Sequence, residues 1–236
     1  MKKYILFGLA LLSFCLLVIL FSPMFNVQKL IVSGNKFVSF ETVSDTINFS
    51  VGQNIFLFNR SSAKKNLLKN YFVKDAKINI HLPNTLSVEI DERTPCCYIK
   101  YLNDSFLLID QNAFIIEVAK SCNKNFPIAT GLDFDSFSLG KTLEINNDKA
   151  LAYVIQLSNL LQKNEIGESI VVDISDVNDI HLYVRNIDVL IGDNENLEQK
   201  ISLLKSILDS NSVYLEKSGT LSIKNINRPP VFKFIT

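Results

Sequence analysis

The 236-residue chain lacks any run of basic residues with interleaved aromatic side chains, and it contains no tryptophan. Lysine and arginine together number 24, as do aspartate and glutamate, so the formal net charge is zero. Proteins that bind nucleic acids usually carry a basic patch that neutralises phosphates. The composition therefore argues against a nucleic-acid partner.

Residues that build active sites and metal centres are also scarce. The sequence has only two histidines, His81 and His181, and neither stands at a ligand spacing. The motifs G-x-S-x-G, H-E-x-x-H and C-x-x-C are absent. Gly140-Lys141-Thr142 resembles the end of a phosphate-binding loop, but the upstream glycine spacing does not fit, so we interpret it as a turn. We expect no catalytic residues, no metal site, no cofactor and no small-molecule substrate.

Two acidic groups have plain structural interpretations. Asp91–Arg93 lies at the end of a predicted strand. We expect these charged residues to form a structural ion pair or to be exposed to solvent as the chain leaves the strand, rather than to act as paired catalytic carboxylates. Asp173, Asp176 and Asp179 are spaced by three, but a strand that passes into a turn would scatter them. We interpret them as solvated loop acids rather than as a calcium site.

The most conspicuous long feature is an apolar run near the N-terminus. Ile5–Phe21 carries no charge, and thirteen of its residues are leucine, isoleucine, phenylalanine or valine. These would favour insertion into a bilayer by at most about 4–8 kcal/mol. The competing interpretation is a cleaved signal peptide, but the run exceeds the usual apolar core of about 7–15 residues and no A-x-A site follows. We expect an uncleaved transmembrane helix over residues 4–25.

The charges that flank this helix predict its orientation. Lys2 and Lys3 precede it, so the positive-inside rule places residues 1–3 in the cytoplasm. The rest of the chain would then lie outside the cell membrane as extracytoplasmic domains. Cytoplasmic enzymes and ATP-driven machines do not fit this topology.

Cysteine usage leaves the redox state open. Cys15 falls in the apolar run, and three further cysteines, Cys96, Cys97 and Cys122, follow it. Neighbouring strand side chains point to opposite faces, so Cys96 and Cys97 rarely bridge each other. One of them could pair with Cys122, although we expect buried or unpaired thiols.

Periodicity after the apolar run indicates a small α+β domain. A β-rich run at Val27–Ser33 ends at Gly34-Asn35, a turn signal. Two helices follow, one after Ser39 as N-cap and one that starts at Ser61 or Ser62. The alternating runs Lys77–His81 and Leu86–Ile90 then form a hairpin around Pro83-Asn84. The face of the second helix is predicted to carry Ala63, Leu67, Leu68 and Tyr71.

The remainder indicates a mixed sheet with two helices. Short strands are predicted at 98–102, 106–109, 114–118, 170–174, 180–184, 189–191, 220–224 and 231–235. Helices are predicted over Asp148–Gln162 and over Leu197–Leu208, the second capped by Asn196. The order strands, helix, strands, helix, strands gives a mixed antiparallel layer in which two helices cover the sheet.

Local motifs carry a resemblance to a known family. The segments VQKLIVSGNK, VGQNIF, VKDAKINIHLPNTLSVEI and DERTP together resemble the POTRA domain of the bacterial division proteins FtsQ and DivIB, and SFLLIDQNAFIIEV resembles the start of their β domain. The resemblance implies a POTRA domain at 26–94 and an FtsQ-type β domain at 95–236. It also implies a single-pass scaffold of the division septum that has no catalytic site.

The same resemblance implies partners. The β domain would bind bitopic proteins of the FtsL and FtsB (DivIC) type, while the POTRA domain would aid recruitment. A septal transpeptidase would be reached indirectly, and septal peptidoglycan synthesis would be organised by positioning. The final strands receive FtsB or DivIC in this family, which points to the C-terminal hairpin here.

The residues of that hairpin fit the chemistry of strand addition. An exposed sheet edge accepts an incoming strand through its N–H and C=O groups, and proline belongs at edges because it cannot donate. The candidate partner-binding residues are Leu221, Ser222, Ile223, Lys224, Val231, Phe232, Lys233 and Phe234. The alternative is that this hairpin only closes the sheet. If it binds a partner, Ile223→Pro should abolish capture and leave the fold mostly intact.

Two other functions remain as alternatives. A membrane-anchored POTRA protein could serve protein export or envelope assembly, although such systems usually add a long β-barrel for which too few residues remain. A surface hydrolase is the weakest alternative, because no nucleophile–base arrangement is identifiable in the sequence.

Overall fold

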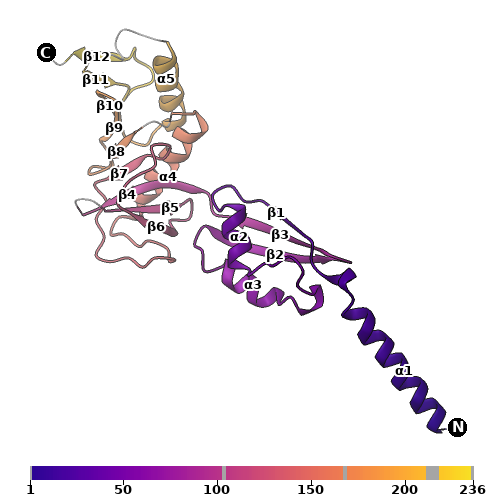
Figure 1. Ribbon diagram of the computed structural model, residues 1–236. Coiled ribbons are helices and arrows are strands. Elements are labelled where there is room, and N and C mark those ends of the chain that lie inside the picture. The colour runs from indigo at the N-terminus through magenta and orange to yellow at the C-terminus, as the bar shows by residue number, and fades with distance from the viewer. Residues whose placement is uncertain (1, 103–104, 167–168, 211–217, 235–236) are drawn as a thin grey trace. The chain divides into compact units, whose positions relative to one another are not determined.

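The structure, a computed structural model, describes residues 2–102, 105–166, 169–210 and 218–234 (Figure 1). The chain divides into two compact units, Met1–Arg93 and Thr94–Thr236. The first unit contains an N-terminal helix and a three-stranded sheet, and the second contains a nine-stranded sheet.

The apolar run forms helix α1 (Lys2–Leu20). Its residues Lys3–Leu20 have a mean hydropathy of 2.4, and none of this stretch is buried. A helix of 19 residues is about 28 Å long, which suits the hydrocarbon core of a bilayer. The helix ends before Pro23, and residues Pro23–Phe25 form a short 3₁₀ turn (η1) capped by the Ser22 side chain. By length and composition, α1 can cross a membrane.

The rest of the first unit has the predicted order of elements. It comprises β1 (Lys29–Ser33), α2 (Phe40–Thr46), the 3₁₀ turn η2 (Ile55–Leu57), α3 (Arg60–Leu67), β2 (Val73–His81) and β3 (Thr85–Glu92). The sheet order is β1-β3-β2, with β1 parallel and β2 antiparallel to β3. Apolar residues of α2 and α3 pack with alternate residues of β2 and β3 in one core.

The predicted cap and end of the second helix need correction. Asn59 caps α3 by accepting from the Ser62 N–H at 3.0 Å, so the helix starts at Arg60 rather than at a serine. It also ends at Leu67, one turn earlier than predicted. Leu68 and Tyr71 therefore remain exposed instead of continuing the buried face.

The turn after β1 is fixed by a glutamate at the end of β3. Gly34 has φ +82°, and a Cβ there would lie 2.1 Å from the Ile90 carbonyl oxygen, so only glycine fits. The Glu92 carboxylate then accepts backbone N–H groups from three successive residues, Lys36, Phe37 and Val38, at 2.8–2.9 Å. Glu92 therefore fixes this loop through backbone N–H groups. The ion pair expected in Asp91–Arg93 forms at Asp91, whose Oδ2 lies 3.9 Å from Lys74 Nζ on the surface.

The second unit is built on one mixed sheet. Its strands are β4 (Pro95–Tyr101), β5 (Ser105–Asp110), β6 (Ile115–Ala119), β7 (Ile128–Thr130), β8 (Val171–Asp173), β9 (Ile180–Val184), β10 (Ile187–Gly192), β11 (Gly219–Ser222) and β12 (Val231–Phe234). The order across the sheet is β12-β11-β10-β9-β8-β7-β4-β5-β6. The pairs β4·β7, β7·β8 and β10·β11 are parallel, and the other pairs are antiparallel. The sequence pattern missed β7, which has only three residues.

Helices α4 (Asp148–Lys163) and α5 (Leu197–Asp209) lie along one side of the row of strands (Figure 1). Asn147 caps α4 by accepting from the Ala150 N–H at 3.3 Å. Buried leucine, isoleucine and valine residues of both helices share one core with the inward residues of the sheet. The predicted α+β class, with a single apolar N-terminal helix, a POTRA-like domain and a mixed sheet with two helices, is confirmed.

A buried lysine replaces the predicted cap at the start of α5. Asn196 has φ +53° and makes no side-chain capping bond, so that prediction is wrong. Instead Lys200, which is 2% exposed, donates from Nζ to the Asp193 carbonyl oxygen at 3.0 Å and to Asp193 Oδ1 at 2.9 Å. This bond from the ammonium holds the pKa of the Asp193 carboxyl below its ordinary value.

A β-bulge explains why both adjacent cysteines are buried. The register of β4 against β5 shifts between Pro95 and Cys97, and this irregularity lets Cys96 and Cys97 both enter the core. The Cys96 thiol and burial together raise the pKa of the Cys97 thiol well above its ordinary value. Burial raises the pKa of Cys122 to about 11. All four cysteines are free thiols in this structure.

We predict that Lys200→Met lowers the free energy of unfolding by about 1–2 kcal/mol, because the Asp193 oxygens lose a charged donor. The wild-type contribution of Asp193 should be complete above its ordinary pKa and should vanish as pH falls through its lowered pKa in the folded protein. Urea unfolding of residues 26–236 at neutral pH and in acid measures both effects.

Lys205→Met is the matched control, because Lys205 pairs with Asp209 on the surface of the same helix. Its effect should be only a few tenths of a kcal/mol. Equal stability of wild type and Lys200→Met at both pH values would show that the buried lysine contributes nothing.

Candidate partner-binding edge

Strand β12 is the last strand of the large sheet among the residues that the structure describes. It pairs with β11 in antiparallel register, from Gly219↔Phe234 to Ser222↔Val231. Val231 and Phe234 are each about half exposed. The predicted C-terminal hairpin therefore exists, and its second strand lies at the edge.

Backbone hydrogen bonds determine which way β11 faces. The Gly219 N–H donates to the Asn186 carbonyl at 3.3 Å, and the Ile223 N–H donates to the Leu190 carbonyl at 3.1 Å. Successive residues of a strand direct their backbone groups to opposite edges. Alternate residues from Gly219 to Ile223 therefore face β10, and those between them face β12.

The same alternation extends to β12. Val231 and Lys233 lie opposite the residues of β11 that face β12, so their backbone groups point toward β11. The backbone groups of Phe232 and Phe234 point toward the outer side of β12. An added strand would meet these two residues first.

The eight candidate residues are thus brought together, but in different environments. Leu221 and Ile223 are buried in the core, at 4% and 2% exposure. Lys224 leaves β11 and forms a 2.6 Å ion pair with Asp179. Only the residues of β12 lie at the sheet edge itself, so strand addition would involve β12 directly and β11 only as its support.

This arrangement overturns the expected effect of Ile223→Pro. The Ile223 N–H belongs to the ladder between β10 and β11, not to an outer edge. Proline there would remove a bond inside the sheet and disturb a buried side chain, so the fold would not stay intact. A partner-binding test therefore belongs on β12.

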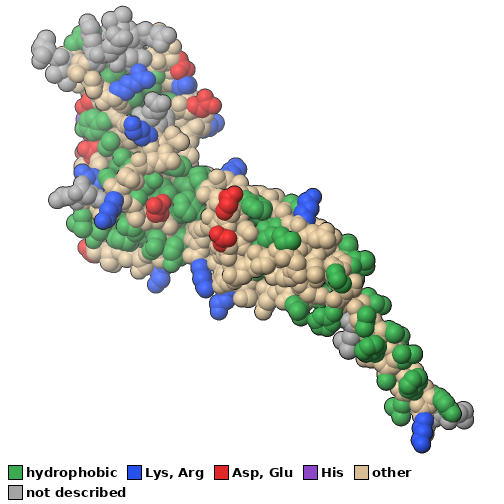
Figure 2. Space-filling view, viewed as in Figure 1, with side chains coloured by type: hydrophobic (Ala, Val, Ile, Leu, Met, Phe, Trp, Pro, Cys, Tyr) green, Lys and Arg blue, Asp and Glu red, His purple; other side chains and the backbone are tan. Residues whose placement is uncertain are grey.

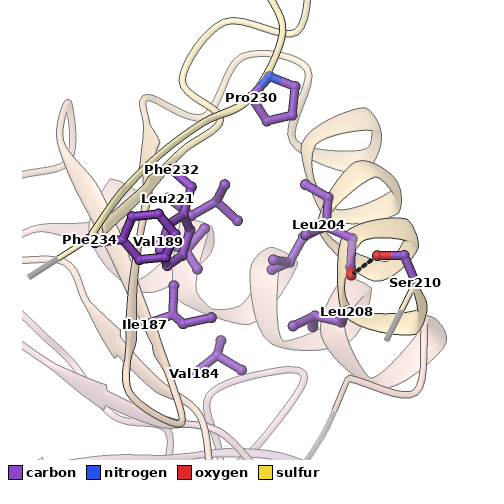
Figure 3. Close-up of a pocket in the computed structure, with 11 residues that line it drawn as sticks. Val184, Ile187, Val189, Leu204, Leu208, Ser210, Leu221, Pro230, Phe232 and Phe234 are labelled. Carbon is purple, nitrogen blue, oxygen red and sulfur yellow. Dashed lines mark hydrogen bonds between the residues drawn. The ribbon is translucent and has the colours of Figure 1, made fainter. Parts of the chain in front are cut away.

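An apolar groove lies behind β12, between the strands and α5 (Figure 3). Its volume is about 370 Å³. The strands and the segment before β12 contribute Val184, Ile187, Val189, Leu221, Pro230, Phe232 and Phe234, and α5 with its C-cap contributes Leu204, Ile207, Leu208 and Ser210. Leucines of α5 and phenylalanines of β12 face each other across it (Figure 3). The sequence predicted both elements but not that they would form a groove.

The close packing of β12 on β11 requires glycine at position 219, because the Phe232 side chain of β12 lies against it. The rings of Phe232 and Phe234 meet edge to face with centroids 5.0 Å apart. A Cβ on Gly219 would come within 2.5 Å of the Phe232 ring and 2.6 Å of the Lys233 carbonyl oxygen. Glycine at this position lets β12 lie close to β11.

The acidic residues nearby are engaged locally. Asp173 Oδ1 accepts from the Ser175 N–H and hydroxyl, and Asp176 Oδ1 accepts from the Asn178 N–H. The Lys224 ammonium holds the pKa of the Asp179 carboxyl below its ordinary value. Within the described ranges, no three of the aspartates, glutamates, histidines and cysteines are placed to hold a metal ion.

We predict that Gly219→Ala loosens the edge. Since the added methyl group would overlap the Phe232 ring, β12 must shift, at a cost of about 1–3 kcal/mol. Hydrogen exchange of the β12 amides should accelerate relative to wild type. Ser222→Ala is the control in the same strand and should leave exchange unchanged. Identical exchange in both variants would contradict the close packing of β11 and β12.

Comparison with known proteins shows which proteins this chain resembles. Residues 25–93 match the model of the FtsQ-type POTRA domain. The chain is 29% identical to the cell division protein DivIB of Clostridium tetani over 96% of this chain and 86% of that protein. It is 28% identical to DivIB of Clostridium botulinum strain Hall over 97% and 90%, and 26% identical to the cell division protein FtsQ of Chloroflexus aurantiacus over 83% and 71%.

Proposed function

Because the chain belongs to the FtsQ/DivIB family of bacterial cell division proteins, we propose that it is a membrane-anchored scaffold whose β12 edge captures small single-pass partners. A role in cell division follows from the family. The family is not a known class of enzyme. The finer assignment, to FtsL- and FtsB/DivIC-type partners and to the organisation of septal peptidoglycan synthesis, is our proposal.

The position of β12 at the end of the sheet is the observation that carries this proposal. An incoming strand would continue the ladder, and each main-chain hydrogen bond would contribute about 0.5–1.5 kcal/mol. The strand has only four residues, so these bonds alone give modest affinity. Side-chain contacts must supply the rest.

The two faces of β12 indicate which side chains a partner would need. Phe232 and Phe234 lie on the face of the groove, while Val231 and Lys233 lie on the other face. A partner strand should therefore alternate, with apolar residues toward the groove and polar or acidic residues toward Lys233. This is the pattern of a short amphipathic β-segment.

Membrane anchorage would place the edge where such partners reside. Helix α1 is long and apolar enough to span the bilayer, and Lys2 and Lys3 favour a cytoplasmic N-terminus. We propose that both domains lie outside the cell membrane and act at the division septum. Transmembrane partners with extracytoplasmic tails would then meet the edge on the same side.

The direct test is affinity capture of tagged full-length protein from detergent-solubilised membranes, with mass spectrometry of the bound proteins. We expect small single-pass proteins with coiled-coil segments, followed by a septal transpeptidase. Recovery of secretion or barrel-assembly components instead would move the function to protein export or envelope assembly.

Variants at Phe234 should separate the contribution of its backbone from that of its ring. Phe234→Ala keeps the N–H that points to the outer side of β12 and loses only side-chain contacts. Phe234→Pro also removes that N–H, so capture should fall by about a further tenfold, equivalent to roughly 1.4 kcal/mol. Thermal unfolding of both variants checks that the fold is intact. Equal capture by the two variants would contradict strand addition at β12.

A further inference from the structure

Three segments that are distant in sequence meet where the chain leaves α1. The Val27 N–H donates to the Gln53 carbonyl, and the Gly52 N–H donates to the Val27 carbonyl, both at 2.8 Å. On the other side, the Gln28 N–H donates to the Asn84 carbonyl at 2.9 Å. The segment after α1 is thus flanked by the loop before α3 and by the turn between β2 and β3.

The junction with α1 is also built from specific contacts. The Asn54 side chain donates from Nδ2 to the carbonyl oxygen of Leu20, the last residue of α1, at 2.8 Å. The rings of Phe25 and Phe56 have centroids 5.1 Å apart. A small core of Val27, Ile55 and Leu86 lies behind these contacts.

Apolar side chains cover this end of the first unit. They are Phe21, Met24, Val51, Phe56, Leu57 and Leu82, which we name the helix-exit surface, and each is between 45% and 71% exposed. Hydrophobic side chains gather along α1 and around the end of the unit from which α1 leaves (Figure 2). Soluble surfaces rarely expose a contiguous patch of this kind without a partner.

The three segments that carry the helix-exit surface hold charge of one sign. The segments 21–29, 50–60 and 80–86 contain no aspartate or glutamate, but they include Lys29 and Arg60 at the starts of β1 and α3. The opposite end of the same sheet carries Asp91 and Glu92. An apolar surface whose own segments carry only basic residues complements a bilayer with anionic headgroups.

We propose that the helix-exit surface docks on the lipid bilayer, in the leaflet from which α1 emerges. The inference rests on the proposed role of α1 as a membrane anchor, since the surface directly continues the end of that helix. Leu57 and Leu82, from two separate loops, would enter the interface together with Phe21 and Met24. The POTRA domain is then held against the membrane rather than suspended on a free linker.

Tryptophan fluorescence can test this, because the natural chain contains no tryptophan. Leu57→Trp and Leu82→Trp would be compared in full-length protein, reconstituted in vesicles of phosphatidylcholine and phosphatidylglycerol with or without brominated acyl chains. Phe37→Trp, beyond the far end of β1, is the matched control within the same domain. We expect quenching at positions 57 and 82 to exceed that at position 37 by at least about threefold, with blue-shifted emission.

A third probe, Leu12→Trp, lies within α1 and tests the premise separately. Strong quenching at position 12 together with quenching at 57 and 82 supports both the anchor and the docked surface. Strong quenching at 12 with none at 57 and 82 overturns the docked surface and leaves the anchor standing. Absence of quenching at 12 would overturn the anchor, and the inference would fall with it.

Discussion

The parallel pairing of β10 with β11 is the constraint on which the C-terminal surface depends. In this pairing the backbone N–H and C=O groups of alternate residues of β11 form hydrogen bonds with β10. The side chains of Leu221 and Ile223 lie in the core. Because β11 is flanked on both sides, β12 becomes the end of the ladder. The groove depends on the same pairing, since α5 connects β10 to β11 in the chain and packs on the face that Leu221 occupies. The edge, the groove and the direction of each backbone group thus follow from one strand pair.

Local patterns predicted the first unit well because its hairpin strands alternate clearly and its turns carry glycine, proline and asparagine. The alternation of Leu86, Val88 and Ile90 fixes the buried face of β3, and Gly34-Asn35 marks the turn that Glu92 later clamps. Prediction failed where a buried polar contact, which the pattern does not reveal, decided the outcome. The pattern around Asn196 is typical of a cap, but Lys200 reaches back to Asp193 and orders the start of α5 instead. Nothing in the spacing distinguishes a lysine that will be buried from one that will be exposed.

In the large sheet, too, some features could not be predicted from local sequence patterns. Strand β7 has three residues, too few for a period to emerge, yet it joins β4 to β8 through two parallel pairs. The C-terminal hairpin was predictable from alternation and from Pro229-Pro230. Which of its two strands lies at the edge was not, because that depends on what pairs with the other side of β11. The helix-exit surface was hidden for a similar reason, since its three segments become neighbours only through backbone bonds at Val27 and Asn84.

A short edge strand and a membrane anchor complement each other energetically. Four residues of β12 offer few ladder bonds, each worth about 1 kcal/mol, so a free peptide would bind weakly in solution. A partner embedded in the same membrane would be confined to the layer next to it, and this confinement would raise its effective concentration without any new contact. Under the proposed function, weak strand pairing would be sufficient within the membrane and would remain reversible outside it.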